Sequence, residues 1–91
     1  MHLEVQFSKQ FDKQLRSAEE NVIKAFKDAL QLLLVNKYHP SLNNHLLAGR
    51  FIGYRSVNII DEWRAIYREM YGEHGMILIF EVLGTQGELF K

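Results

Sequence analysis

Apolar and polar residues alternate at the start of the chain and then change to a helical period. The run HLEVQF at residues 2–7 has an apolar residue at every second position, which predicts a short first strand. Ser8 follows as the expected N-cap of a helix. Phe11, Leu15 and Ala18 would form the apolar stripe of that helix.

A second helix is predicted directly after the first. Ser17 and Glu20 have the spacing of a capping box, and the helical period continues to about Asn36. The apolar face expected for this helix consists of Val22, Phe26, Ala29 and Leu33. Because the connection is so short, the two helices should form an antiparallel hairpin.

Three strand-like runs fill most of the second half of the chain. They cover residues 50–60, 62–71 and 76–83, and GEHG at 72–75 reads as a hairpin loop. Short connections imply antiparallel neighbours. The expected fold is α+β, a single domain over residues 1–91. Its order is β-α-α-β-β-β, an antiparallel sheet packed by the N-terminal helical hairpin.

Arginines stand among apolar residues in two of these strands. Alternation puts Arg64 on the face opposite Trp63, while Arg55 shares a face with Val57. An arginine in such a place either pairs with a carboxylate or holds a phosphate. A surface or salt-bridged arginine remains the plain alternative for each.

His45 is the histidine best placed for chemistry. It stands in an asparagine-rich segment before the second predicted strand, and a loop histidine can act as an acid or a base. The alternative is a merely exposed side chain. The histidines are scattered without ligand spacing, so no metal site is expected, and no cofactor motif such as a P-loop or a nucleotide-binding glycine pattern is present.

Composition limits the cellular location and the kinds of binding partner that we expect for this protein. The 91 residues include no cysteine, and the N-terminus lacks the pattern of a signal peptide. No apolar run is long enough for a bilayer, so a cytoplasmic protein without membrane contact is expected. The formal net charge is zero, which argues against a binder of long nucleic acid but leaves room for a small phosphate site.

Three motifs carry a family resemblance. GYR at 53–55, EWR-x-I-Y at 62–67 and GT-x-x-x-LF at 84–90 resemble the RelE/ParE superfamily of bacterial toxins, and within it the YafQ-like branch. The resemblance implies a RelE-like fold and the toxin of a type II toxin–antitoxin system. It also implies a ribosome-dependent mRNA endoribonuclease that needs no metal, because the RNA 2′-hydroxyl attacks the adjacent phosphorus. The implied partners are a cognate antitoxin, the ribosome and mRNA.

The resemblance also implies site residues. The catalytic candidates are His45, Glu62, Arg64 and Gln86, and the substrate-binding candidates are Arg55, Trp63 and Phe90. Glu62 replaces the aspartate that is usual in the branch.

Three positions depart from the pattern of the branch. Asn58 and Gln86 stand where histidines are expected, and Val82 stands where a phosphate-binding arginine is expected. Glutamine cannot act as a general acid. A second hypothesis is therefore a non-nuclease member, either a ParE-like gyrase poison or a weakened toxin that mainly binds its antitoxin. A third is an unrelated small α+β binding module.

Overall fold

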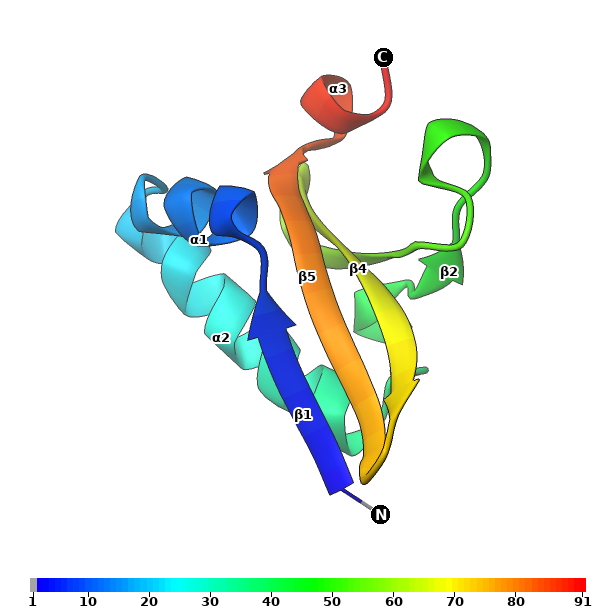
Figure 1. Ribbon diagram of the computed structural model, residues 1–91. Coiled ribbons are helices and arrows are strands. Elements are labelled where there is room, and N and C mark those ends of the chain that lie inside the picture. Colours follow the sequence, from blue (N-terminus) through cyan, green and yellow to red (C-terminus); the bar gives the residue numbers. More distant parts are fainter. Residues whose placement is uncertain (1) are drawn as a thin grey trace.

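The computed structural model describes residues 2–91 and has an α+β fold (Figure 1). Its elements are β1 His2–Phe7, α1 Lys9–Arg16, α2 Glu20–Val35, β2 His45–Leu46, β3 Arg55–Ile60, β4 Trp63–Gly72, β5 Gly75–Thr85 and α3 Gln86–Leu89. Two short 3-10 turns, η1 Pro40–Leu42 and η2 Gly49–Phe51, lie between α2 and β3. The predicted order is confirmed, with a two-residue strand and a one-turn helix added to it.

The strands form one sheet in the order β1-β5-β4-β3-β2. Strands β2 to β5 pair antiparallel, as predicted, whereas β1 runs parallel to β5. Figure 1 shows β1 and β5 side by side at the centre of the molecule. Short links force antiparallel pairing only between strands that they join. No short link joins β1 to β5, so the sequence did not constrain their direction.

The core lies between the sheet and the two long helices. The buried face of α2 consists of the four residues expected from the sequence, Val22, Phe26, Ala29 and Leu33. Rings of Phe7, Phe11, Phe26 and Phe80 pack with centroids 5.1 to 6.1 Å apart. Aromatic pairs at this spacing add to the stabilisation that comes from burial. This cluster joins β1, both helices and β5.

Strand β4 divides its side chains between the two faces of the sheet. Trp63, Ala65 and Tyr67 pack in the core, as alternation predicts. Ile66 is also fully buried but does not belong to the core cluster. A bulge shifts the register of β4 and β5 between Ile66 and Tyr67. The second face of the sheet is therefore partly covered too, and Arg64 of β4 lies on that side.

The prediction of a capping box at the start of α2 is wrong. Glu19 is the N-cap of α2 and makes no side-chain capping bond. Ser17 instead closes α1, because its N–H donates to the carbonyl of Lys13 at 3.1 Å. A residue held in the last turn of one helix is not free to cap the next. The predicted N-cap of α1 is confirmed, since Ser8 Oγ accepts from the Phe11 N–H at 2.9 Å.

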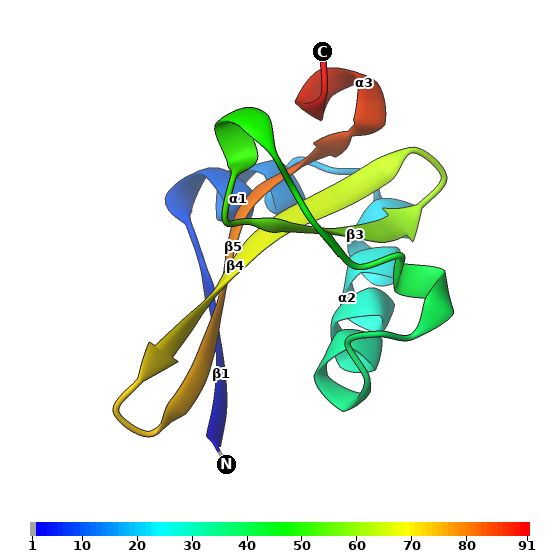
Figure 2. The same ribbon diagram turned by 90° about the vertical axis from the view of Figure 1, so that its right-hand side faces the viewer.

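The strand expected from residue 50 begins only at Arg55. Residues 49–51 form η2, and a turn follows it. Gly49 and Gly53 have φ angles of 67° and 89°, in the left-handed region that favours glycine. Two such residues interrupt an extended chain. The resulting loop and α3 lie at the same end of the sheet (Figures 1 and 2).

Candidate active site

A cavity opens at this end of the sheet, on the face away from α1 and α2. Its volume is about 500 Å³, and it is lined by Asn43, His45, Leu47, Arg64, Gln86 and Phe90. One wall comes from residues 43–47, called here the β2 segment. Strand β4 supplies Arg64, and the C-terminal segment supplies Gln86 and Phe90. The structure thus brings together four of the seven site residues suggested by the sequence.

Backbone alternation explains which residues of the β2 segment reach the cavity. Asn43, His45 and Leu47 line it, and the residues between them do not. Successive side chains of an extended chain point to opposite faces, which places His45 and Leu47 on the same side, whereas Asn43 precedes the strand in a left-handed conformation. Asn43 and Leu47 were not expected from the sequence. Leu47 lies two positions after His45 and would have been expected in the cavity if a strand had been predicted here.

The ring of His45 is oriented by the backbone beside it. His45 Nδ1 lies 2.8 Å from the carbonyl oxygen of Asn43. A carbonyl oxygen only accepts, so Nδ1 carries the proton. In the neutral ring Nε2 then holds the free lone pair, and no described residue occupies it. His45 is exposed, so this nitrogen is accessible to a substrate.

One guanidinium nitrogen of Arg64 is hydrogen-bonded to the backbone, and the other two have no partner among residues 2–91. Its Nη1 donates to the carbonyls of Asp61 and Trp63, both at 2.9 Å. Nε and Nη2 have no partner among residues 2–91, so they are available to an anion. Across the sheet Arg64 pairs with Asn58 on one side and Gly84 on the other. Neither neighbour supplies a carboxylate that would neutralise it.

The C-terminal segment is a short capped helix and not a simple turn. Thr85 Oγ1 accepts from the Glu88 N–H, and Glu88 Oε1 accepts from the Thr85 N–H at 2.8 Å, which makes a capping box. The bonds from the Thr85 backbone and hydroxyl lower the pKa of Glu88. The N–H of Gln86 also donates to the carbonyl of Glu62 at 2.8 Å. These contacts fix Gln86 at the edge of the cavity.

Phe90 both lines the cavity and packs against the loop before β3. Its ring lies 6.0 Å from that of Phe51, edge to face. Arg50 Nη2 donates to the carbonyl of Leu89 at 3.0 Å, and Leu89 itself is buried. The tail therefore both lines the cavity and packs against the loop before β3.

The other three candidates lie outside the cavity. Glu62 is exposed in the β3–β4 turn, where its backbone carbonyl and not its carboxylate meets α3. Trp63 packs against the main core. Arg55 donates through Nε to Asn44 Oδ1 at 2.8 Å. For Trp63 and Arg55 this agrees with alternation along the strands, which puts both on the core face, whereas the family resemblance suggested them as site residues without regard to the face.

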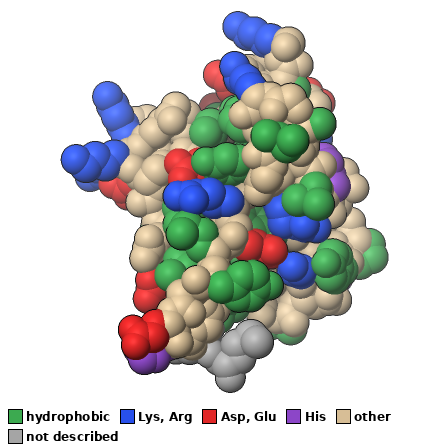
Figure 3. Space-filling model, turned by 45° about the vertical axis from the view of Figure 1, so that its right-hand side comes forward, with side chains coloured by type: hydrophobic (Ala, Val, Ile, Leu, Met, Phe, Trp, Pro, Cys, Tyr) green, Lys and Arg blue, Asp and Glu red, His purple; other side chains and the backbone are tan. Residues whose placement is uncertain are grey.

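The cavity is weakly charged, and of the three departures from the family pattern only Gln86 lines it. Val82 is half-buried opposite Ile66, and Gln86 is neutral at the edge of the cavity. The amide oxygen of Asn58 is buried without a partner among residues 2–91. Acidic, basic and apolar side chains are interspersed on the face of the molecule shown in Figure 3. Arg64 is thus the one arginine or lysine that lines the cavity within the described chain.

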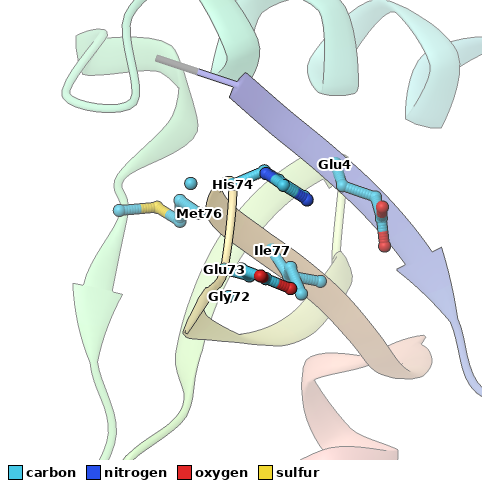
Figure 4. A pocket seen from close by; sticks show the side chains of 7 residues that line it. Glu4, Gly72, Glu73, His74, Met76 and Ile77 are labelled. Carbon is cyan, nitrogen blue, oxygen red and sulfur yellow. The ribbon is translucent and has the colours of Figure 1, made fainter.

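A second hollow of about 410 Å³ lies at the β4–β5 hairpin, between the side chains of Glu4, Glu73, His74, Met76 and Ile77 (Figure 4). It contains none of the residues suggested by the sequence. Within residues 2–91, no three His, Asp or Glu side chains gather as metal ligands. No helix in that range is long and apolar enough to cross a membrane.

Residues 3–91 match the model of the YafQ family, bacterial toxins of type II toxin–antitoxin systems. The chain belongs to this family. The match covers nearly the whole sequence, including every residue that lines the cavity. No curated protein sequence matches this YafQ-family chain closely enough to count as a relative.

Solved structures support the same assignment. YafQ from E. coli shares 30% identity, with a TM-score of 0.67 over 99% of this chain and 100% of its own. The E. coli DinJ–YafQ toxin–antitoxin complex matches at 28% identity and a TM-score of 0.65, over all of both chains. The archaeal RelE–RelB complex from Pyrococcus horikoshii matches at 19% identity and a TM-score of 0.71, over 96% of this chain and 98% of that one, which shows the fold alone. The predicted RelE-like fold of this YafQ-family toxin is confirmed.

Proposed function

We propose that this YafQ-family toxin is a ribosome-dependent mRNA endoribonuclease and that the cavity lined by His45 and Arg64 is its active site. One observation carries the proposal. A free imidazole nitrogen and an unneutralised guanidinium line the same open cavity. These are the two groups needed to remove a hydroxyl proton and to bind the phosphate under attack.

The proposed reaction needs no metal. His45 Nε2 takes the proton of the RNA 2′-hydroxyl, and the 2′-oxygen forms a bond to the adjacent phosphorus. The bond from phosphorus to the 5′-oxygen breaks, which leaves a 2′,3′-cyclic phosphate and a 5′-hydroxyl. Arg64 stabilises the charge that develops on the phosphate oxygens. Gln86 donates a hydrogen bond to the phosphate, and Phe90 offers its ring to a nucleobase.

The leaving oxygen takes its proton from water in this scheme. Gln86 has no proton to give near neutral pH, and His45 lies on the side of the attacking hydroxyl. A positioned general acid typically contributes about 10²- to 10⁴-fold to a rate. We therefore expect a slow nuclease compared with a relative that has histidine at this position.

Two partners follow from the proposal. A cognate antitoxin is one, since YafQ of E. coli was solved with DinJ and archaeal RelE with RelB. The ribosome carrying mRNA is the other, which would place the active protein in the cytoplasm. Coexpression with the product of the neighbouring gene, followed by copurification, tests the first partner.

Induced expression in a bacterial host tests the activity. We expect growth arrest together with new mRNA 5′ ends inside reading frames. His45→Ala and Arg64→Ala should each relieve the growth arrest and leave only slow residual cleavage. Glu62→Gln is the matched control because its carboxylate lies outside the cavity, and it should remain toxic. Full toxicity of Arg64→Ala would contradict the site.

A second candidate function is supported by the uncharged positions Val82 and Gln86. A non-nuclease member of the superfamily, either a gyrase poison or a toxin that mainly binds its antitoxin, would not need a phosphate-binding arginine at residue 82. DNA damage without new mRNA ends would indicate the gyrase poison. Normal growth together with antitoxin binding would indicate the weakened toxin.

A further inference from the structure

We propose that Asn44 is a positioning residue for His45. Its side chain is bound on the helix side of the sheet and thereby fixes the imidazole in the cavity on the other side. This inference rests on the proposed function, because it assigns His45 the role of the base.

Asn44 uses all of its hydrogen-bonding groups on the protein. Its Nδ2 donates to the carbonyl of Lys37 at 3.1 Å and to the hydroxyl of Tyr67 at 2.8 Å. Its Oδ1 accepts from Arg55 Nε at 2.8 Å. A flipped amide would set its oxygen against the Lys37 carbonyl and its nitrogen against the Arg55 donor. The three partners therefore fix a single orientation of the side chain.

Two of the three residues that bind Asn44 are themselves attached to β4 or belong to it. Tyr67 is fully buried, and burial raises the pKa of its hydroxyl, so the phenol stays neutral at physiological pH. Lys37 Nζ pairs with Glu69 Oε2 of β4 at 2.9 Å, and this bond raises the pKa of the Lys37 ammonium. Both ends of the segment from Lys37 to Asn44 are thus attached to β4.

Besides Asn44, the β2 segment is held by the Leu47 N–H, which donates to the Tyr54 carbonyl, and it follows Leu42, which is buried in the core. β2 pairs with β3 through two residue pairs, His45 with Ser56 and Leu46 with Arg55. Both residues of β2 are exposed. So short a ladder with exposed side chains buries little apolar surface and opens easily. Two of the three bonds of Asn44, those with Tyr67 and Arg55, link this segment to the sheet through side chains.

Because neighbouring side chains in a strand point to opposite faces, the bonds of Asn44 on one face also position His45 on the other. Asn44 points to the helix side, and His45, the next residue, points into the cavity. Loss of the Asn44 bonds would let the imidazole move relative to Arg64, which β4 holds independently. A misplacement of about 1 Å can cost about 10²-fold in rate. Substrate binding by Arg64 and Phe90 would change little.

A double-mutant cycle with purified toxin and mRNA-programmed ribosomes tests the assignment. Asn44→Ala should lower the single-turnover cleavage rate about 10- to 100-fold with the half-saturating ribosome concentration nearly unchanged. In a His45→Ala background it should have no further effect. Asn36→Ala is the matched control just before the segment from Lys37 to Asn44; its side chain accepts from the Tyr38 N–H and not from the partners of Asn44, so the rate should be unchanged. Equal losses in both backgrounds would overturn the proposal.

Two further variants keep the proposal testable if the Asn44→Ala protein does not fold. Tyr67→Phe removes one bond to Asn44, and Asn44→Asp keeps the acceptor for Arg55. Both should lower the rate less than Asn44→Ala does and should keep the unchanged half-saturating concentration. If either variant folds and cleaves at the full rate, the proposal fails.

An NMR measurement separates this proposal from the proposed function. Asn44→Ala should speed amide exchange at Leu47, whose N–H donates to the Tyr54 carbonyl at 2.9 Å, and should change the His45 ring signals. Core amides should keep their protection. If the wild-type protein cleaves nothing but these changes occur, the proposed function fails and the positioning stands. If neither signal changes, the positioning fails whatever the activity.

Discussion

The backbone N–H of Gln86 donates to the backbone carbonyl of Glu62 at 2.8 Å. Both residues are catalytic candidates from the sequence, and the structure joins them through the main chain. The bond ties the β3–β4 turn to the first turn of α3. Gln86 reaches the cavity as a result, while the carboxylate of Glu62 points elsewhere. Substitutions around α3 should therefore affect the cavity more than substitutions of the Glu62 side chain.

Gly84→Ala should displace α3. A Cβ at Gly84 would lie 3.1 Å from Leu89 Cδ2 and 3.2 Å from its Cγ. Leu89 is buried and has little room to move, so overpacking should cost about 1 to 3 kcal/mol. Denaturant unfolding measures the loss, and cleavage should fall with it. Gly87→Ala is the control, because a Cβ there meets nothing within 4 Å. Equal stability of the two variants would contradict this packing.

Asn43 should tolerate glycine better than alanine. Its φ of 44° lies in the left-handed region, and its carbonyl orients the ring of His45. A residue without a short polar side chain pays about 1 to 2 kcal/mol there, so Asn43→Ala should lower the free energy of unfolding. Asn43→Gly should keep the backbone conformation and most of the cleavage rate. Urea unfolding and single-turnover cleavage of both variants check this. The expectation fails if alanine performs as well as glycine.

Gln86→His should accelerate cleavage. The substitution adds a titratable group at the edge of the cavity that already contains His45 and Arg64. If it protonates the leaving oxygen, the rate should rise towards the 10²- to 10⁴-fold typical of a general acid. Mapped 5′ ends and single-turnover rates give the answer. Gln86→Asn serves as the neutral control. An unchanged rate would mean that the defect lies elsewhere, with Val82 the first position to test.

The C-terminal helix should loosen in acid. The Thr85 N–H and hydroxyl lower the pKa of Glu88 in the folded protein. A lowered folded pKa means that this capping contribution is present above the unfolded pKa. It is lost as the pH falls through the folded pKa. NMR titration of the Thr85 amide should show this loss in the acid range. Glu88→Gln should remove the pH dependence, and an identical titration in that variant would exclude Glu88 as its source.

The helices and most strands follow from the sequence because their signals are local. The apolar face of α2 is set by a helical period, and burial of Val22, Phe26, Ala29 and Leu33 follows wherever that helix packs. Alternation likewise predicts that Trp63, Ala65 and Tyr67 face the core. The N-cap at Ser8 is local too, since donor and acceptor are three residues apart.

The site depended on contacts that sequence periodicity does not encode. Asn44 meets Tyr67 across 23 positions, and Gln86 meets the carbonyl of Glu62 across 24. Such contacts decide which side chains of the motifs share a cavity. The sequence by itself determined the family, the α+β fold and the faces of the long elements. Tertiary structure decided the parallel pairing of β1 and the grouping of His45, Arg64, Gln86 and Phe90, because both depend on segments that meet only in the folded chain.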